Sequence, residues 1–255
     1  MSSMTREHNA IDRPLRPLVS VIVVVFRDRV ELEAVVDSIL PFRGPDLELL
    51  VIDGGSEDGS VELLGNMGDQ VDYWLSERDA GVYDAMNKGI RAARGTYVLH
   101  VNAGDRLLAI PWEQLRSASL AGVDVVSGRV HMDSSATFLP RTGFLSRIDN
   151  TWHHQGTFYL RKTHTGYDPS YRICGDFNWN QRLLKAGCSV EHSSILIAEH
   201  RNDGLSMQKN ARREIYRSIR ETFGPLYLLP AAARFMMAPL WRFAKVFRQG
   251  GRVRH

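Results

Sequence analysis

Three loops in the first half of the chain carry acids, glycines and amides directly after apolar runs. They are residues 51–60 (VIDGGSEDGS), 76–90 (SERDAGVYDAMNKGI) and 99–105 (LHVNAGD). Carboxylates and amides accept and donate hydrogen bonds to a ribose or a base, and glycines let backbone amides approach a ligand closely. Because the carboxyl ends of parallel strands meet at one edge of a sheet, these loops predict a nucleotide-binding site.

The first loop has a functional and a structural interpretation. Asp53 ends an apolar run and is followed by Gly54, which suits contact with a ribose or base. A tight loop in which Asp58 or Ser60 caps the next helix would explain the same residues. The first apolar run continues as Val25-Phe26-Arg27-Asp28, without the G-x-G-x-x-G pattern of dinucleotide-binding proteins. The sequence therefore lacks the main evidence for a dehydrogenase.

Alternating strand and helix patterns position these loops. Residues 18–26 (LVSVIVVVF) are a β-branched run typical of a strand buried on both faces of a parallel sheet, and residues 82–93 carry an apolar helical stripe. Further strands are predicted over 47–52, 71–75, 96–101, 123–130, 156–161 and 189–198, and helices over 30–40, 61–64 and 176–186. The alternation favours a Rossmann-like α/β fold, and 255 residues with 44% apolar content fit one compact domain.

The three loops, in this order and spacing, closely resemble the N-terminal half of bacterial family-2 glycosyltransferases. These are inverting enzymes that use nucleotide-sugar donors to build surface polysaccharides and glycolipids. The family commonly shows SEPDxGIYDAMNKG at 76–89, so Arg78 replaces a proline and Val82 an isoleucine. The resemblance covers residues 18–206 and implies a catalytic domain of GT-A fold, with a Rossmann-like, mostly parallel central sheet and flanking helices.

The same resemblance implies which residues hold the donor. The base, ribose and phosphates would contact Phe26, Asp53, Gly54, Asp79, Asn87, Lys88 and Asn102. In the family the acid at Asp79 approaches the donor, while Asn87 and Lys88 lie near the nucleotide and phosphates. The structural alternative is that Asp79 and Asp84 favour the N-terminus of a helix electrostatically and that Lys88 is an exposed surface residue.

A divalent cation is expected at the third loop. Residues 102–105 (NAGD) match the family's NSDD or NSGD, which makes Asp105 the expected ligand of Mn²⁺ or Mg²⁺. Gly104 stands where many members carry the first acid, so a single carboxylate and the donor phosphates would hold the ion. In 195–206 (ILIAEHRNDGLS), His200 or Asp203 is a further candidate for the metal or phosphate site. A capped turn is the structural alternative.

Two later segments resemble the acceptor side and the catalytic base. Residues 152–159 (WHHQGTFY) are similar to the family's HQxxFF, so His154 and Gln155 are expected to bind the acceptor, or else to be partly buried polar residues with internal partners. Residues 171–179 (YRICGDFNW) resemble the segment that supplies the base, which assigns this role to Asp176. Asn178 stands where some relatives have a second acid. An N-cap is the alternative for Asp176.

The two ends of the chain differ in charge. Residues 1–17 are polar without the apolar core of a secretory signal, so we expect a flexible N-terminus and a cytoplasmic protein. After Glu221 there is no acid but a charge of +6, while the remaining 26 basic and 29 acidic residues sum to −3. We expect 207–255 to form a basic helical tail, peripheral at the anionic inner face of the cytoplasmic membrane, or to pack on the fold. No nucleic-acid module is present.

The sequence therefore predicts a metal-dependent, hexosyltransferase-class glycosyltransferase that acts on a lipid-linked or polysaccharide acceptor. A sugar nucleotidyltransferase would share the nucleotide half, but its glycine- and lysine-rich N-terminal loop is absent between Val25 and Val30. A relative that binds the donor without turnover is the third interpretation, because of Gly104 and Asn178. The sugar, the base, the acceptor and a homo-oligomeric state stay open.

Overall fold

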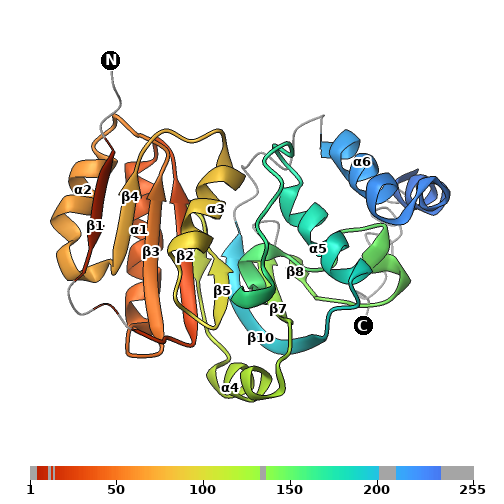
Figure 1. Cartoon of the computed structure of the whole chain (residues 1–255), viewed down its shortest axis with the longest axis horizontal. Coiled ribbons are helices and arrows are strands. Elements are labelled where there is room, and N and C mark those ends of the chain that lie inside the picture. Colours follow the sequence, from red (N-terminus) through yellow and green to blue (C-terminus); the bar gives the residue numbers. More distant parts are fainter. Residues whose placement is uncertain (1–4, 11–12, 14, 133–135, 201–210, 237–255) are drawn as a thin grey trace, which may run out of the picture.

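The computed structural model describes residues 5–10, 13, 15–132, 136–200 and 211–236. Within them one mixed sheet has the strand order β1-β4-β3-β2-β5-β9-β7-β10-β6, with β8 paired to β7 (Figure 1). The strands are β1 (Arg6–Asn9), β2 (Val19–Val25), β3 (Leu47–Asp53), β4 (Tyr73–Ser76), β5 (Tyr97–His100), β6 (Arg106–Leu107), β7 (Val125–Met132), β8 (Ala136–Phe138), β9 (Thr157–Leu160) and β10 (Val190–His200). The helices are α1 (Arg29–Ile39), α2 (Ser60–Met67), α3 (Val82–Ala92), α4 (Trp112–Ala121), α5 (Gly175–Lys185) and α6 (Ala211–Phe223).

Four adjacent parallel strands, β4, β3, β2 and β5, form the nucleotide half that the sequence predicts. Every residue of β2 and β3 is buried, as the continuous apolar runs indicate. Their register pairs Val25 with Asp53, so both strands end at the same edge. The loops that follow Val25, Asp53, Ser76 and His100 therefore gather there.

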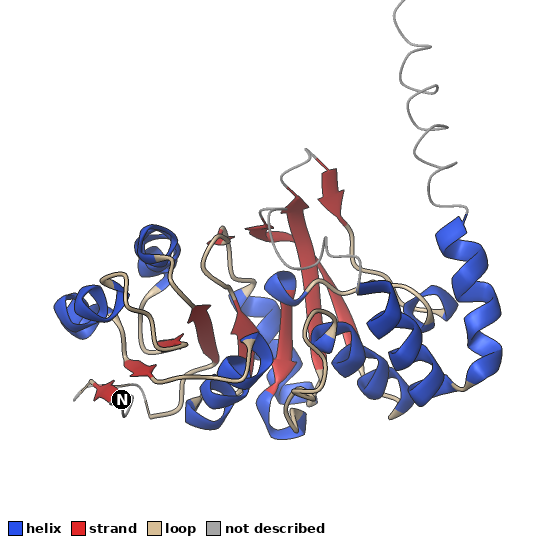
Figure 2. Ribbon diagram, turned by 90° about the horizontal axis from the view of Figure 1, so that it is seen from above, coloured by secondary structure: helices blue, strands red, loops and turns tan. Residues whose placement is uncertain are grey.

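Alternate residues of the central strands face two helical layers. Val21, Val23 and Val25 pack with α1, α2 and α4 in one apolar cluster. Ile22 and Val24 pack with α3 and α5 in another. Helices thus cover both faces of the sheet, and α3 and α5 meet on the same face (Figures 1 and 2).

The second half of the sheet is more mixed than the alternation of elements suggests. β9 is antiparallel to both β5 and β7, whereas β7 and β10 run parallel. The insertion of β9 carries the preceding 3-10 helix His154–Gly156 to the edge where the parallel strands end. This topology brings residues near 154 to the predicted nucleotide site.

The N-terminal segment contains a strand that its polar sequence does not predict. β1 pairs antiparallel with β4 and covers that edge of the parallel block. Arg13 is buried, and its Nε donates to Glu48 Oε2 at 2.8 Å. Strand pairing and a buried ion pair therefore involve residues 6–9 and 13 of the segment 1–17, whose flexibility stays a prediction.

The first part of the predicted tail belongs to the fold. α6 packs on α5, and residues 228–236 form a further helix that packs against both through Ile219 and Ala231. The expected helical structure is confirmed for 211–223 and 228–236, and the basic residues from Arg242 onward lie outside the described residues. No helix in the described part of the chain is both long and apolar enough to cross a membrane.

Candidate active site

A cavity of about 910 Å³ opens where the parallel strands end. Its walls come from the loops after β2, β3, β4 and β5, from α3, from the segment before β9, and from the starts of α5 and α6. Nine of the predicted site residues line it: Phe26, Gly54, Asp79, Asn102, Asp105, His154, Gln155, Asp176 and His200. The volume is at the upper end of the range for small-molecule sites.

The Asp105 carboxylate is buried and held by three groups. His200 Nδ1 lies 2.7 Å from Oδ1, and Gln155 Nε2 donates to Oδ2 at 3.0 Å. The backbone N–H of Asn102 also donates to Oδ2 at 3.2 Å. A carboxylate oxygen only accepts, so the His200 Nδ1 at 2.7 Å from Asp105 carries the ring proton. Gln155 Nε2, 2.9 Å from the same Nδ1, therefore donates to Asp105 and not to His200.

The Asp176 carboxylate begins α5 and has two side-chain partners. His154 Nδ1 lies 3.1 Å from Oδ2, and the Tyr83 hydroxyl lies 3.1 Å from Oδ1. The single hydroxyl hydrogen of Tyr83 is shared with the carbonyl of Ile173 at 2.7 Å. Burial opposes ionisation of Asp176, yet the hydrogen bond from His154 lowers the pKa of its carboxyl. Asp176 is therefore ionised at neutral pH.

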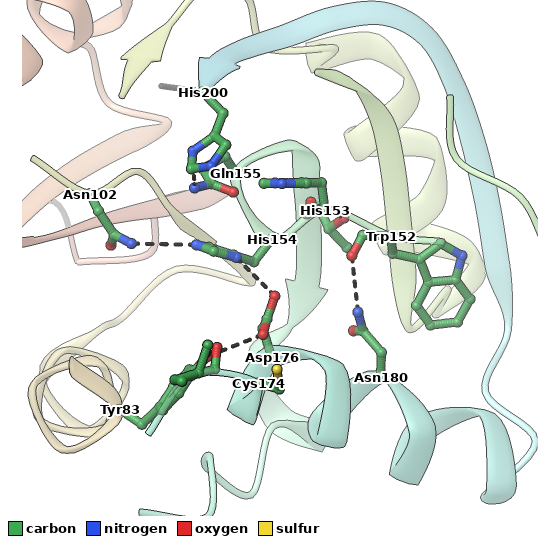
Figure 3. A network of polar contacts seen from close by, with 12 residues as sticks. Tyr83, Asn102, Trp152, His153, His154, Gln155, Cys174, Asp176, Asn180 and His200 are labelled. Carbon is green, nitrogen blue, oxygen red and sulfur yellow. Dashed lines mark hydrogen bonds and ion pairs between the residues drawn. The ribbon is translucent and has the colours of Figure 1, made fainter. Parts of the chain in front are cut away.

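Asn102 connects the two carboxylates. Its Nδ2 lies 3.4 Å from His154 Nε2 (Figure 3). Its backbone N–H bonds to Asp105. A neutral His154 with the proton on Nδ1 donates to Asp176 and accepts from Asn102, so this tautomer satisfies both contacts. His153 stacks on His154 at 5.6 Å between ring centroids. Burial first, then the nearby imidazoles, lower the pKa of His153 to about 3, which keeps it neutral.

The opposite end of the cavity suits a base and a ribose. Phe26 is exposed there and offers a ring face, and Gly54 lies between Phe26 and Asp79. A Cβ atom on Gly54 would lie 2.6 Å from Asp79 Oδ2 and 3.1 Å from the Phe26 ring, so only glycine fits without displacing a neighbour. Burial raises the pKa of the Asp79 carboxyl, although the Gly81 N–H and Lys88 oppose the shift.

Three predicted donor residues do not line the cavity. Asp53 accepts hydrogen bonds from the backbone and hydroxyl of Ser56 and from the Ser76 hydroxyl. The next helix, α2, has Gly59 at its N-cap and no side-chain cap. Asn87 exchanges hydrogen bonds with the Tyr167 backbone. The Lys88 ammonium lies 3.0 Å from Glu77 and 3.7 Å from Asp84. Donor contacts by Asp53, Asn87 and Lys88 stay predictions.

Some lining residues were not predicted from the sequence. The sequence gives Tyr83 no role beyond its place in the family motif, yet Tyr83 and its neighbour Val82 both line the cavity. Ala211 and Ile215 of α6 also line the cavity, although they lie beyond the segment that carries the resemblance. Asn178 bonds to the Ser218 hydroxyl at 3.1 Å, so its side chain serves the contact between α5 and α6.

The oxygen atoms around Asp105 fit part of a divalent-cation site. Gln155 Oε1 and Asn102 Oδ1 are buried without a hydrogen-bond partner in the described structure. The Gln155 side chain and the Asn102 backbone contact the carboxylate directly. Carboxylate and amide oxygens suit Mg²⁺ and Mn²⁺. The described residues contain no group of three or more His, Cys, Asp or Glu side chains arranged to hold a metal. Phosphate oxygens of a donor would therefore have to complete the shell.

Sequence comparison identifies related proteins. The family model described as "Glycosyl transferase family 2" matches residues 20–182. A protein of Mycobacterium tuberculosis (strain ATCC 25177 / H37Ra), named "PGL/p-HBAD biosynthesis glycosyltransferase", is 31% identical over 206 residues. This match covers 74% of the present chain and 78% of the relative.

Solved structures share the fold. S. aureus TarS 1–349 in complex with UDP-GlcNAc matches with a TM-score of 0.63 and 13% identity, covering 80% of this chain and 66% of that one. The mannosyltransferase PcManGT from Pyrobaculum calidifontis, in complex with GDP-Man and Mn²⁺, matches with a TM-score of 0.58 and 18% identity, covering 88% and 70%. The chain spans 38% of a longer TarS structure. These likenesses confirm the predicted α/β architecture.

Proposed function

The chain belongs to glycosyltransferase family 2 and has its GT-A fold, and on this premise we propose that it is an inverting transferase using a nucleotide-diphosphate-sugar donor. The acceptor we propose is a lipid-linked saccharide or a polysaccharide, at the cytoplasmic face of the membrane. The observation that carries the proposal is one cavity containing two buried carboxylates, Asp105 and Asp176, connected through Asn102 and His154.

The donor is proposed to extend from Phe26 to Asp105. Phe26 supplies a face for the base, Asp79 accepts hydrogen bonds from the ribose, and the diphosphate reaches Asp105. TarS is described in complex with UDP-GlcNAc and PcManGT with GDP-Man, which supports a nucleotide sugar of either base. The mycobacterial relative is named for PGL/p-HBAD biosynthesis, which supports a glycolipid product.

A divalent cation is proposed at Asp105. Asp105, with His200 and the amide oxygens of Gln155 and Asn102 beside it, would hold the ion together with the donor diphosphate. When bound, the cation would neutralise the charge that develops on the leaving diphosphate. That PcManGT is described with Mn²⁺ supports this choice of metal.

Asp176 is proposed as the general base. An acceptor hydroxyl attacks the anomeric carbon, its proton passes to the Asp176 carboxylate, and the sugar–phosphate bond breaks with its electron pair leaving on the diphosphate. His154 and Tyr83 hold the carboxylate in place, and hydrogen bonding to the ionised form keeps it ready to accept a proton. Burial and the charge of Asp176 raise the pKa of the Tyr83 phenol, so Tyr83 stays a donor.

The two other interpretations have less support. A sugar nucleotidyltransferase needs the glycine- and lysine-rich loop that is absent after β2. A donor-binding relative without turnover was suggested by Asn178 and Gly104. Because Asn178 bonds to Ser218 and does not line the cavity, the amide at 178 removes no acid from the site. Gly104 alone is a weak reason to exclude catalysis, since Asp105 is present beside it.

Thermal unfolding of the full chain with a panel of nucleotide sugars, in Mn²⁺ or in chelator, tests the donor and the metal. A cognate donor stabilises the native state by mass action, so one member should raise Tm, and more so with Mn²⁺. Asp105→Ala should remove the difference between Mn²⁺ and chelator, while the exposed Asp37→Ala should keep it. If no nucleotide sugar binds, but a nucleoside triphosphate and a sugar phosphate yield pyrophosphate, the chain is a nucleotidyltransferase and the proposal is wrong.

A further inference from the structure

An apolar stripe is exposed on the last described helix. Leu229, Ala233 and Met236 follow each other at four and three positions, and Leu226 precedes them by one turn. The exposed fractions of Leu226, Leu229 and Met236 are 79%, 73% and 71%. The other side of the same helix is also apolar, since Ala231 is fully buried against α5 and α6. A helix that is apolar on both sides needs a partner for its outer face.

A second exposed apolar segment adjoins the stripe. Phe144 and Leu145 lie in the 3-10 helix Phe144–Arg147, and both are exposed. The Phe144 ring stacks on Tyr227 at 5.9 Å between centroids, and Arg147 donates to the Tyr227 hydroxyl at 2.9 Å. Single exposed apolar residues are ordinary, but contiguous ones mark interaction sites. We call the joint surface the docking surface: Phe144, Leu145, Leu226, Leu229, Ala233 and Met236.

Charge identifies the partner. From Thr222 to the end of the chain there is no acidic residue, and the six basic ones give +6. Arg234 is ion-paired with Asp149 at 2.9 Å, and the other five basic residues lie outside the described part of the chain. Apolar side chains interleaved with arginine and lysine match the interface of an anionic bilayer. A second copy of the chain would bring the same excess of positive charge against itself, which is unfavourable.

The helix that carries the docking surface packs on α5 and α6, which line the acceptor side of the cavity. The helix of 228–236 stands beside α5 and α6, at the end of the molecule remote from the N-terminus (Figure 2). α6 contributes Ala211 and Ile215 to the cavity wall, and α5 begins with Gly175 and Asp176. A bilayer in contact with the docking surface would therefore lie next to the part of the molecule that carries Asp176.

We propose that the docking surface binds the interface of an anionic membrane and holds the Asp176 side of the cavity close to it. Membrane binding is a property of the surface and does not need turnover. The proposed function is needed for one point only, which is that membrane contact would bring Asp176 close to a lipid-linked acceptor. The apolar contacts provide insertion into the headgroup region, and the basic residues add an attraction that salt weakens.

Co-sedimentation with vesicles tests this proposal on the full chain. Phosphatidylcholine vesicles containing phosphatidylglycerol should bind the protein at low salt, and pure phosphatidylcholine should bind it less. The variant Leu226→Gln/Leu229→Gln/Met236→Gln should lose at least about tenfold in affinity. Leu120→Gln, at a 92% exposed leucine on α4, is the matched control and should bind like the wild type. Asp176→Asn should also bind normally, which separates docking from catalysis.

Several results would overturn the proposal. Equal vesicle binding by the triple variant and the wild type would show that these residues do not dock. Failure of the wild type to bind anionic vesicles at low salt would exclude a membrane partner. If the wild type is a dimer by size-exclusion chromatography with light scattering and the triple variant is a monomer, the surface binds a second copy instead. Because the substituted side chains are exposed, unchanged thermal unfolding should accompany each variant.

Discussion

The Tyr83 hydroxyl lies 3.1 Å from Asp176 Oδ1, although 93 positions separate the two residues in the sequence. Tyr83 belongs to the first turn of α3, which follows the donor-side loop, and Asp176 begins α5 on the acceptor side. The contact requires close approach, because a Cβ atom on Gly175 would lie 2.8 Å from the Tyr83 ring. This hydrogen bond and the close approach at Gly175 therefore join the start of α3 to the start of α5, together with the bond from the Tyr83 hydroxyl to the Ile173 carbonyl.

Tyr83→Phe should change the pH dependence of transfer. Removing a donor from the ionised carboxylate raises the pKa of Asp176, so the acidic limb of kcat/KM should move to higher pH by about one unit. The pH profile of the variant measures this shift. Tyr97→Phe is the control, since it removes a buried hydrogen bond to the Val123 carbonyl far from the site. An unchanged acidic limb in Tyr83→Phe would show that Tyr83 does not act on Asp176.

Gly54→Ala should weaken donor binding through Asp79. The new methyl group would occupy a position 2.6 Å from Asp79 Oδ2, and the flexible end of that side chain can move away. We expect the donor Kd to rise about tenfold or more with little loss of stability. Gly65→Ala in α2, where the added Cβ meets no atom within 4 Å, is the control and should leave the Kd unchanged. A donor Kd that stays unchanged in Gly54→Ala would contradict a donor contact by Asp79.

Acid should destabilise the folded chain at mildly low pH. Burial is the main cause that lowers the pKa of His153 and His164 to about 3, and it also lowers the pKa of His100 well below 6.5. The unfolded chain therefore binds more protons than the folded one below pH 6.5, so stability falls as the pH drops from 6.5 toward 3.

Urea unfolding at pH 7.5 and pH 5.5 measures this loss. The free energy of unfolding should fall by about 2–4 kcal/mol between these values, since each fully shifted histidine contributes about 1.4 kcal/mol per pH unit. His164→Asn should be less stable at pH 7.5 but should lose less on acidification. Equal stability of the wild type at both pH values would mean that these imidazoles reach water in the folded state.

Local patterns predicted the parallel half of the fold well. The run at 18–26 matches β2, and the helical stripe at 82–93 matches α3, both to within a residue or two. A strand buried on both faces gives a continuous apolar run, whereas a helix buried on one face gives an apolar stripe, so the two patterns are easily told apart. The N-terminal strand escaped prediction for a physical reason. Its residues are polar, and they pair with the edge of β4, which is distant in sequence. Arg13, which follows the strand, depends in the same way on the buried carboxylate of Glu48.

In the candidate site, too, short motifs predict single residues but not the contacts that depend on the tertiary fold. Asp105 and Asp176 could be placed from short motifs, and both line the cavity. Their partners His200 and Tyr83 come from β10 and α3, so the pairings depend on how β9 enters the sheet and how α5 packs against α3. Asp53 illustrates the reverse case. A strand-end acid suits a ligand, but a serine in the loop after β3 and the last serine of β4 bond to its carboxylate instead, and a sequence pattern alone does not choose between these outcomes.

Turnover by Asp176→Asn is the most direct test of the central claim. The amide keeps the shape of the carboxylate but cannot take the acceptor proton, so release of nucleoside diphosphate with acceptor should fall about 10²–10⁴-fold while the donor Kd is retained. Asp168→Asn, whose carboxylate bonds to the backbone of Ser170 outside the cavity, should keep full activity. Wild-type product should carry the inverted anomeric configuration. Activity retained in Asp176→Asn, or product with the donor's configuration, would contradict the account.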